Sequence, residues 1–179
     1  MHDETFPALV EAYYAPLYRF ALSLAKNSSD AGDLTQQTFY VWARKGDALR
    51  DKSKARSWLF TTLYREFLRT RRRGNRITAI EALAPGQQDM ADAEVDLVAR
   101  LDAPLVIEAL QEVDDAFREP LAFFYLQELS YREIAEILGL PIGTVMSRLS
   151  RGKAQLRVRL AEKSTGGSII EFPRKNARP

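Results

Sequence analysis

The residues best suited to chemistry lie between Ser130 and Arg151, and the chemistry is recognition rather than catalysis. Ser130 and Glu133 have the S-x-x-E spacing of a capping box, Gly139 suits the left-handed end of a helix, and Pro141 suits the first turn of the next helix. This pattern predicts two helices joined by a tight turn. One face of the second helix carries hydroxyl, guanidinium and amide groups that can bond to base edges and phosphates, namely Thr144, Ser147, Arg148, Arg151 and Gln155. The layout is typical of a helix-turn-helix, whose second helix lies in the major groove of DNA.

Apolar residues indicate how the two short helices would hold that polar face outward. The first helix has an apolar face made of Ile134, Ala135, Ile137 and Leu138. The second has apolar residues at steps of four, seven and four, which are Val145, Leu149, Leu156 and Leu160. Two further helices, over 105–113 and 120–127, are expected to complete this unit. A helical hairpin whose arginines are merely solvated is the alternative interpretation.

The first half of the chain predicts three longer helices, over residues 4–26, 30–45 and 54–73. Each has apolar residues at helical spacing, and Asp30 suits the N-cap position of the second helix. A loop over 46–53 joins the second helix to the third, and no period-two strand pattern appears in the chain. These stripes predict a compact helical domain.

A change in composition separates the two halves. From Ile77 through Ala99 there is no Lys or Arg but there are five acids, and Pro85-Gly86 interrupts any helix. The C-terminal end is rich in Ser, Gly and Pro and is expected to be disordered. The sequence therefore predicts an all-α fold of two small helical domains joined by a flexible linker. The expected bounds of the first domain, the linker, the second domain and the tail are 1–75, 76–101, 102–163 and 164–179.

Charge is distributed unevenly along the chain, although the net charge is only +2. Residues 41–80 hold 12 Lys/Arg and 3 Asp/Glu, a net of +9, and residues 120–164 hold 7 and 4, a net of +3. Between them, residues 81–119 hold 2 Lys/Arg and 11 Asp/Glu, a net of −9. Basic blocks attract nucleic-acid phosphates whatever the base sequence. We expect the acidic segment to be a spacer, or to fold back on a basic face and compete with phosphate.

Composition argues against an enzyme. The chain has no cysteine, its one histidine is His2, and no cluster has metal-ligand spacing, so we expect no metal and no cofactor. No GxxxxGK[ST] loop occurs, and the adjacent Asp114 and Asp115 do not share a helix face. There is no run of about 18 apolar residues and no signal pattern, which predicts a cytoplasmic protein without membrane insertion.

The C-terminal pattern resembles a known family. The stretch YREIAEILGLPIGTVMSRL, from Tyr131 to Leu149, and the RGK that ends at Lys153 are similar to region 4 of bacterial RNA polymerase sigma factors. The most similar group is the extracytoplasmic-function (ECF) class of the sigma-70 superfamily. Gly152 stands where this family usually has alanine, and Met146 stands where lysine is common. The resemblance implies that the second helix reads the −35 promoter element through Thr144, Ser147, Arg148 and Arg151.

The N-terminal half resembles region 2 of the same family. The stretch DLTQQTFYVW, from Asp33 to Trp42, is similar to the helix with which sigma factors hold the clamp coiled coil of RNA polymerase. The resemblance implies a polymerase-binding face made of Asp33, Gln36, Gln37 and Tyr40. These positions fall opposite the apolar stripe, where an ordinary polar face is the alternative. Gly32 and Gln37 replace acids that are frequent in the family.

Residues 54–73 resemble the helix that engages the −10 promoter element. Opening a duplex requires a platform for an unstacked base and cations for the phosphates. The resemblance implies a −10 surface made of Arg50, Lys52, Arg56, Thr61, Arg65, Arg69 and Arg72. Many family members have Asn at position 65 and Asp at position 69. Arg71, Arg72 and Arg73 are expected to bind phosphate without sequence preference, and Trp58 is expected in the core.

The resemblance covers roughly residues 5–162 and implies a sigma factor. Such a protein binds core RNA polymerase, through its clamp coiled coil and its flap, and directs promoter-specific transcription initiation on promoter DNA. The sequence leaves open whether an anti-sigma factor also binds the chain. A stand-alone helix-turn-helix regulator is the alternative function. It would use only the C-terminal hairpin, so it would not need the motifs of the N-terminal half.

Overall fold

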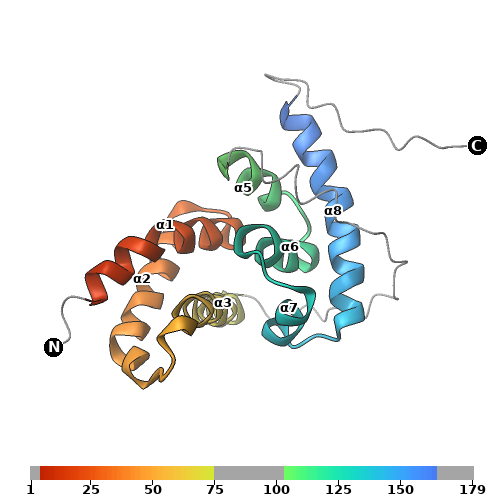
Figure 1. Ribbon diagram of the computed structural model, residues 1–179. Helices are drawn as coiled ribbons and strands as arrows, with labels where there is room; N and C mark the ends of the chain where they lie inside the picture. Colours follow the sequence, from red (N-terminus) through yellow and green to blue (C-terminus); the bar gives the residue numbers. More distant parts are fainter. Residues whose placement is uncertain (1–4, 75–102, 165–179) are drawn as a thin grey trace, which may run out of the picture.

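The computed structural model describes residues 5–74 and 103–164, and every regular element in these two ranges is helical (Figure 1). The elements are α1 (Thr5–Ala25), α2 (Ser28–Lys45), the short 3₁₀ turns η1 (Gly46–Ala48) and η2 (Lys52–Lys54), α3 (Ala55–Gly74), α5 (Ala103–Gln111), α6 (Asp115–Gln127), α7 (Tyr131–Leu138) and α8 (Ile142–Ser164). The predicted all-α class is confirmed. The predicted linker and the predicted tail beyond Ser164 lie outside the described residues, so the domain bounds stay predictions.

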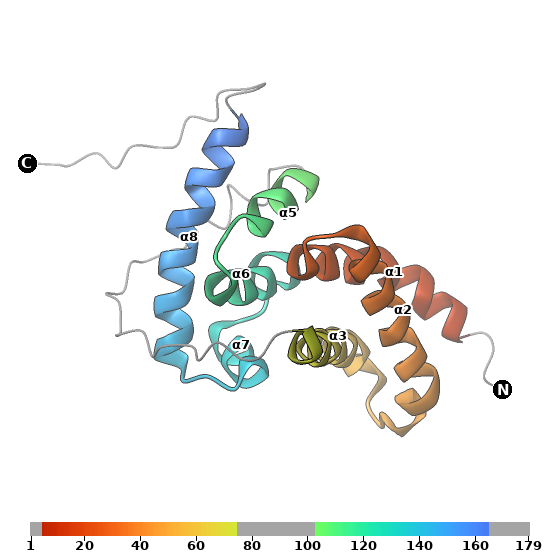
Figure 2. The ribbon, with the colours of Figure 1, turned by 180° about the vertical axis from the view of Figure 1, so that it is seen from behind.

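Helices α1, α2 and α3 pack against one another and are called the N-terminal unit here (Figure 2). The apolar stripes expected from the sequence face inward. The core of the unit includes Leu17, Phe20 and Leu24 from α1, Leu34 and Phe39 from α2, and Leu59 and Leu63 from α3. Burial of this apolar surface is the main term that stabilises a helical unit of this size.

The start of α2 differs from the prediction. Asp30 was expected to be the N-cap, but the helix begins at Ser28 and its N-cap is Asn27. The side-chain oxygen of Asn27 accepts a hydrogen bond from the Asp30 backbone N–H at 2.8 Å, and its amide nitrogen donates to the Asp30 carboxylate at 2.8 Å. Asn27 therefore occupies the cap and Asp30 supports it from the first turn, where a negative charge is favourable.

Helices α5 to α8 form the C-terminal unit, and its hairpin of α7 and α8 follows the sequence closely. The Ser130 hydroxyl accepts from the Glu133 N–H at 3.3 Å, and the Glu133 carboxylate accepts from the Ser130 N–H at 2.8 Å. This confirms the predicted capping box. Gly139 has a φ of +65°, a left-handed conformation that glycine adopts without strain, and α7 ends there.

Helix α6 begins five residues earlier than expected. The sequence predicted this helix over residues 120–127, so that Pro120 would be its first residue. The structure starts α6 at Asp115, where the N–H groups of Phe117 and Arg118 donate to the Asp114 carbonyl at 2.9 and 2.8 Å. Pro120 then lies just beyond the first turn, where it removes one backbone donor without ending the helix.

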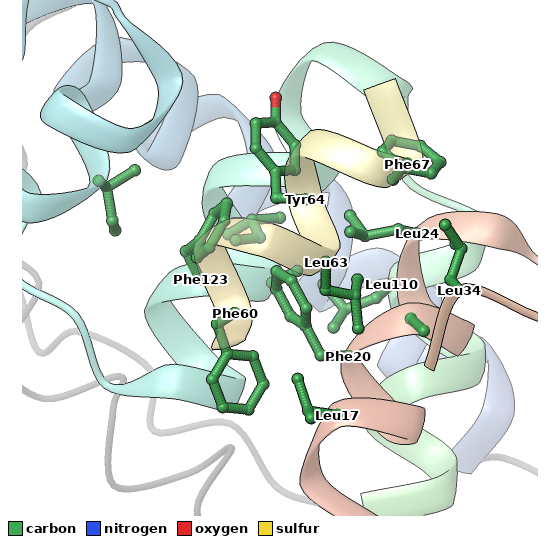
Figure 3. Packing of buried hydrophobic residues seen from close by; sticks show 14 of the residues in the cluster. Leu17, Phe20, Leu24, Leu34, Phe60, Leu63, Tyr64, Phe67, Leu110 and Phe123 are labelled. Atoms are coloured by element: carbon green, nitrogen blue, oxygen red, sulfur yellow. The ribbon is translucent and has the colours of Figure 1, made fainter. Parts of the chain in front are cut away.

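The two units share one apolar core, which the sequence did not indicate. The ring of Phe123 on α6 lies 4.8 Å from that of Phe20 on α1 and 5.3 Å from that of Tyr64 on α3, measured between centroids. Figure 3 shows these three rings in one cluster. Phe123 and Phe20 are fully buried. The part of the contact between the units that is formed by Phe20, Tyr64, Arg71, Glu119 and Phe123 is called the seam here.

Candidate polymerase and promoter interfaces

The outer face of α2 carries the polar residues predicted to bind polymerase. All of them are exposed, namely Asp33, Gln36, Gln37 and Tyr40. On the opposite face the hydroxyls of Thr35 and Thr38 donate to carbonyls of the preceding turn at 2.8 and 2.7 Å, so these buried polar groups are satisfied within the helix. Tyr40 keeps 56 % of its surface exposed, and the Arg44 guanidinium lies 5.6 Å from its ring centroid. Arg44 was not predicted, although its spacing of four from Tyr40 is a detectable signal.

The segment between α2 and α3 is ordered by short-range contacts. The Asp51 carboxylate accepts from the Ser53 hydroxyl at 2.6 Å and from the Ser53 N–H at 3.1 Å, and these bonds hold its pKa below the ordinary value. The Lys52 ammonium donates to the Gly46 carbonyl at 3.2 Å and lies 5.6 Å from the centroid of the Trp42 ring. Arg50 is exposed. Arg50 and Lys52 are the two cations of this segment that were predicted to engage the −10 element. Of these, Lys52 is held against Gly46 and Trp42.

A pair of tryptophans holds this segment against the N-terminal unit. The rings of Trp42 and Trp58 meet edge to face, with centroids 5.1 Å apart. Trp58 is half-buried and packs against the core, as the sequence predicted. At Gly46 a Cβ atom would lie 2.7 Å from the Trp42 ring, so the chain turns there at a residue without a side chain. The ring contact therefore joins α2 to the first part of α3.

The cations predicted to engage the −10 element lie in several different environments along α3. Arg65 and Arg72 are exposed, and Thr61 is half-buried. Arg69 is exposed but forms an ion pair with Glu66 at 2.8 Å on the same helix. Arg56 is exposed, and its Nη2 atom approaches the C-terminal unit, where it lies 3.4 Å from the carbonyl oxygen of Gln127.

The residues predicted to read the −35 element do not share one exposed face of α8. Arg151 is exposed and Thr144 is half-buried. Ser147 is only 1 % exposed, and its hydroxyl donates to the Thr144 carbonyl at 3.2 Å. Arg148 is 6 % exposed. The sequence placed both outward because they lie off the apolar stripe, but α8 packs against α5, α6 and α7 and therefore buries a wider strip of its surface.

Three residues of α8 fix this helix to its neighbours, and the sequence did not assign them this role. The Gln155 amide donates to the Asp114 carboxylate at 2.7 Å, and its oxygen accepts from the Asp114 N–H at 3.1 Å. The buried Lys153 ammonium lies 4.5 Å from the ring centroid of Phe124. A Cβ atom at Gly152 would lie 2.8 Å from Leu121, so glycine permits a close approach of α8 to α6.

A cavity of about 570 Å³ lies between α2 and α3. Its lining includes Asp33 and Gln37 from the polar face of α2 and Glu66, Arg69 and Arg71 from α3. The predicted polymerase face and the basic end of α3 are therefore neighbours. In the described parts of the chain, no group of His, Cys, Asp and Glu side chains is placed to hold a metal ion. None of the described helices is long and apolar enough to cross a bilayer.

Both units match models of one protein family. Residues 9–77 match the model described as "Sigma-70 region 2", and residues 105–156 match "Sigma-70, region 4". The first match covers the N-terminal unit from α1 to α3, which decides against a regulator that has only the C-terminal hairpin. The chain belongs to the ECF group of the sigma-70 family. It is an RNA polymerase sigma factor that directs transcription initiation, and its family is non-catalytic.

Relatives with ECF names extend over nearly all of this sigma factor. SigL of Mycobacterium tuberculosis is 30 % identical over 159 residues, which cover 87 % of this chain and 88 % of the relative. SigW of Bacillus subtilis is 28 % identical over 170 residues, which cover 89 % and 91 %. SigE of Mycolicibacterium smegmatis is 36 % identical over 163 residues, which cover 88 % of this chain but only 62 % of the relative.

Two solved structures resemble this sigma factor across both units. The sigma factor RpoE, in complex with the anti-sigma factor NepR from Bartonella quintana, has a TM-score of 0.64 and 28 % identity, with 88 % of this chain and 97 % of that chain covered. CnrH, in complex with the cytosolic domain of CnrY, has a TM-score of 0.58 and 25 % identity, with 89 % of each chain covered.

Proposed function

We propose that α2 binds core RNA polymerase while α3 and α8 each hold one promoter element in the cytoplasm. The observation that carries this proposal is the outer face of α2. It presents a carboxylate, two amides and a phenol, from Asp33, Gln36, Gln37 and Tyr40, on a helix whose other face is buried. Such a face has no role in packing the N-terminal unit, and its polar groups suit a charged partner helix.

The basic surface of α3 and the preceding turn suits the −10 element. Arg50, Arg65 and Arg72 are exposed and attract phosphates, so they would draw promoter DNA to the N-terminal unit without reading its sequence. An unstacked base in the opened duplex needs an aromatic or apolar platform. Trp58 keeps part of its ring accessible and meets Trp42 edge to face, so it is the aromatic group that we propose for this platform.

The start of α8 suits the −35 element. Arg151 and Thr144 retain accessible surface, whereas Ser147 and Arg148 do not. An arginine that bonds to both acceptor atoms of a guanine edge discriminates against other bases by about 1–3 kcal/mol. Under this proposal Arg148 reads a base after it has been uncovered, and Arg151 contributes beside it.

A protein inhibitor is the remaining partner in this proposal. It is supported by the two solved structures, in which similar sigma factors are bound to NepR and to CnrY. A protein that copurifies with this chain and suppresses initiation in a reconstituted assay would be such an inhibitor. Initiation that stays unchanged after its addition would contradict that role.

The test is a reconstituted transcription assay with purified core polymerase and this chain. Changing Asp33 and Gln36 together to Ala should weaken binding to core polymerase by about tenfold, because two polar contacts worth about 1.4 kcal/mol in total are lost. Glu11→Ala, a change at an exposed residue of α1, is the matched control and should leave binding unchanged. Equal affinities of the double variant and the parent, with helicity retained in both, would remove α2 as the polymerase interface.

A further inference from the structure

The start of α8 carries two accessible apolar side chains that the packing of the C-terminal unit does not use. Ile142, the first residue of α8, is 49 % exposed, and Met146 is half-buried. Neither is among the described apolar residues that form the core or pack against it, although Val145 between them is. The two side chains therefore present a surface that is available to a partner.

Helical geometry places these two side chains beside each other. Residues four apart in sequence are neighbours on the surface of a helix, and they lie about 6 Å apart along its axis. The Cα–Cβ bonds of a helix tilt toward its N-terminus, so the side chain of the first residue projects ahead of the helix. Ile142 and Met146 are called the apolar pair here. This pair lies at the leading end of the helix that is proposed to read DNA.

The leading end of α8 is also the end at which a recognition helix meets the bases. In helix-turn-helix proteins, the N-terminal residues of the second helix contact base edges in the major groove. The other end of α8 is held by α5, where Lys163 pairs with Glu112 at 2.6 Å and with Glu108 at 3.7 Å. Figures 1 and 2 show α5 beside the upper part of α8 and α7 beside its start. The contact with α5 therefore leaves the apolar pair uncovered.

The charges of α8 indicate what kind of partner the apolar pair would meet. From Pro141 to Ala161 the chain has five Lys/Arg and no Asp/Glu. Two of these cations, Arg151 and Arg157, are exposed. A segment whose charges are all positive favours a polyanion, and an apolar pair within it favours a polyanion that also carries apolar groups. The base edges in the major groove of DNA carry such a group, which is the 5-methyl of thymine.

Met146 departs from the family pattern in a direction that fits this partner. Lysine is common at this position in the family, whereas this chain has an uncharged thioether side chain. A lysine can donate to the acceptor atoms of guanine or to phosphate, and a methionine cannot. The flexible and polarizable methionine side chain instead adapts its shape to an apolar surface. The change from lysine to methionine therefore exchanges a polar contact for an apolar one.

We infer that Ile142 and Met146 determine specificity at the −35 element by packing against the 5-methyl groups of thymines at neighbouring base pairs. This inference rests on the proposed role of α8 at the −35 element. The separation of about 6 Å within the pair corresponds to about two base steps of 3.4 Å, so both side chains can reach methyl groups of neighbouring pairs. Loss of one such methyl contact should weaken binding by about fourfold, which is the effect of exposing about one buried CH₂ group.

The test removes the methyl group from the DNA and the apolar pair from the protein. The full chain bound to core polymerase selects a −35 probe from random duplexes, and each thymine of that probe is then replaced in turn by uracil. Uracil lacks only the 5-methyl group, so the base pair and its acceptor atoms are kept. Ile142→Ala and Met146→Ala are compared with Val158→Ala as the matched control. Val158 is 54 % exposed on the same helix, but it lies 16 residues after Ile142, about 24 Å along the axis.

The parent should lose affinity by about fourfold when uracil replaces a contacted thymine. Ile142→Ala and Met146→Ala should each bind the thymine probe more weakly by a similar factor, and each should lose the discrimination between thymine and uracil at the pair that its side chain contacts. Val158→Ala should discriminate as the parent does. Met146→Lys should prefer guanine to thymine at the pair that Met146 contacts, because lysine bonds to the acceptor atoms of guanine.

Several results would overturn the inference. The parent could bind the thymine and uracil probes equally, or the selected −35 element could contain no thymine in either strand. Ile142→Ala could also lose the same affinity on both probes, which would show that the apolar pair packs against polymerase and not against DNA. Failure to select any −35 element would contradict the proposed function together with this inference, whereas a selected element that is insensitive to the methyl groups would contradict this inference alone.

Discussion

The two units expose their predicted functional residues to different degrees. On α2 every residue assigned to polymerase is exposed, whereas on α8 two of the four residues assigned to the −35 element, Ser147 and Arg148, are buried. Family resemblance supplied both roles, and both sets were expected to face outward because they lie off the apolar stripe of their helix. The reasoning succeeds on α2 because only one side of that helix is packed. It fails for half of α8 because that helix contacts α5, α6 and α7.

The largest expected effect tests whether the two units are coupled through their shared core. Phe123→Ala should lower the free energy of unfolding by about 3–5 kcal/mol, because it leaves a cavity among buried rings. Both tryptophans of the chain, Trp42 and Trp58, lie in the N-terminal unit, so their fluorescence during urea unfolding reports that unit alone. We expect the tryptophan transition to shift to lower urea.

The neighbouring Phe124 offers a matched control. Its ring meets Tyr125 and Tyr131 inside the C-terminal unit, with centroids 5.0 and 5.6 Å away. Phe124→Ala should therefore affect the tryptophan transition less than Phe123→Ala does. If the tryptophan transition were the same in Phe123→Ala and in the parent, the two units would unfold independently. Their shared core would then not couple them.

The next effect concerns packing within the C-terminal unit. Gly152→Leu should destabilise the chain by about 1–3 kcal/mol, because even a Cβ atom there would lie 2.8 Å from Leu121 and 3.0 Å from Phe117. Gly143→Leu, on the same helix, has no atom within 4 Å of its added Cβ and should not destabilise the chain. Thermal unfolding followed by circular dichroism measures both. Similar losses in the two variants would show that α8 does not approach α6 closely at Gly152.

A smaller effect tests the capping box of α7. Ser130→Ala should cost about 1 kcal/mol, because the N–H of Glu133 loses its acceptor and the Glu133 carboxylate loses the hydroxyl donor. Ser57→Ala, at an exposed serine of α3, is the control and should change stability by less than about 0.5 kcal/mol. Chemical denaturation at neutral pH distinguishes the two changes.

The same cap predicts a pH dependence. Hydrogen bonds from the Ser130 hydroxyl and from the Ser130 N–H lower the pKa of Glu133 below the value of an unfolded glutamate, about 4.3. The unfolded chain therefore takes up this proton first, so the contribution is complete above about pH 5 and is lost as the pH falls through the folded pKa. The difference in stability between Ser130→Ala and the parent should shrink in acid. A difference that stays constant down to about pH 3 would contradict this role of the ionised carboxylate.

Local features of the fold were predictable from the sequence, and contacts between distant segments were not. The capping box at Ser130 and the left-handed Gly139 depend on neighbouring residues, so the sequence shows them directly. The cap of α2 was assigned to Asp30 instead of Asn27 because both residue types suit the position and only the structure distinguishes them. The sequence placed Phe123 in an expected helix over 120–127 but gave no sign that Phe20 and Tyr64 would be its neighbours.

The candidate site shows the same limit. The exposed face of α2 follows from helical periodicity alone, and it was predicted in full. Gln155 bonds to Asp114 and Lys153 contacts the ring of Phe124. Both contacts depend on how α8 crosses α6, and no short-range sequence pattern predicts that crossing. Family resemblance supplied the roles of the residues, but it could not supply the arrangement in which Arg148 is covered.

Arg148 is predicted to read the −35 element in the polymerase complex although it is buried in the free chain. The direct measurement is transcription by core polymerase with Arg148→Ala on promoters that differ in single −35 bases. The activity of Arg148→Ala should fall by an amount that depends on the −35 base. The lost discrimination between bases should be about 1–3 kcal/mol, because base contacts specify the DNA sequence whereas phosphate contacts only position the protein. Arg72→Ala should reduce activity about equally on all promoters and flatten the dependence on salt. Equal, base-independent losses in the two variants would contradict the claim.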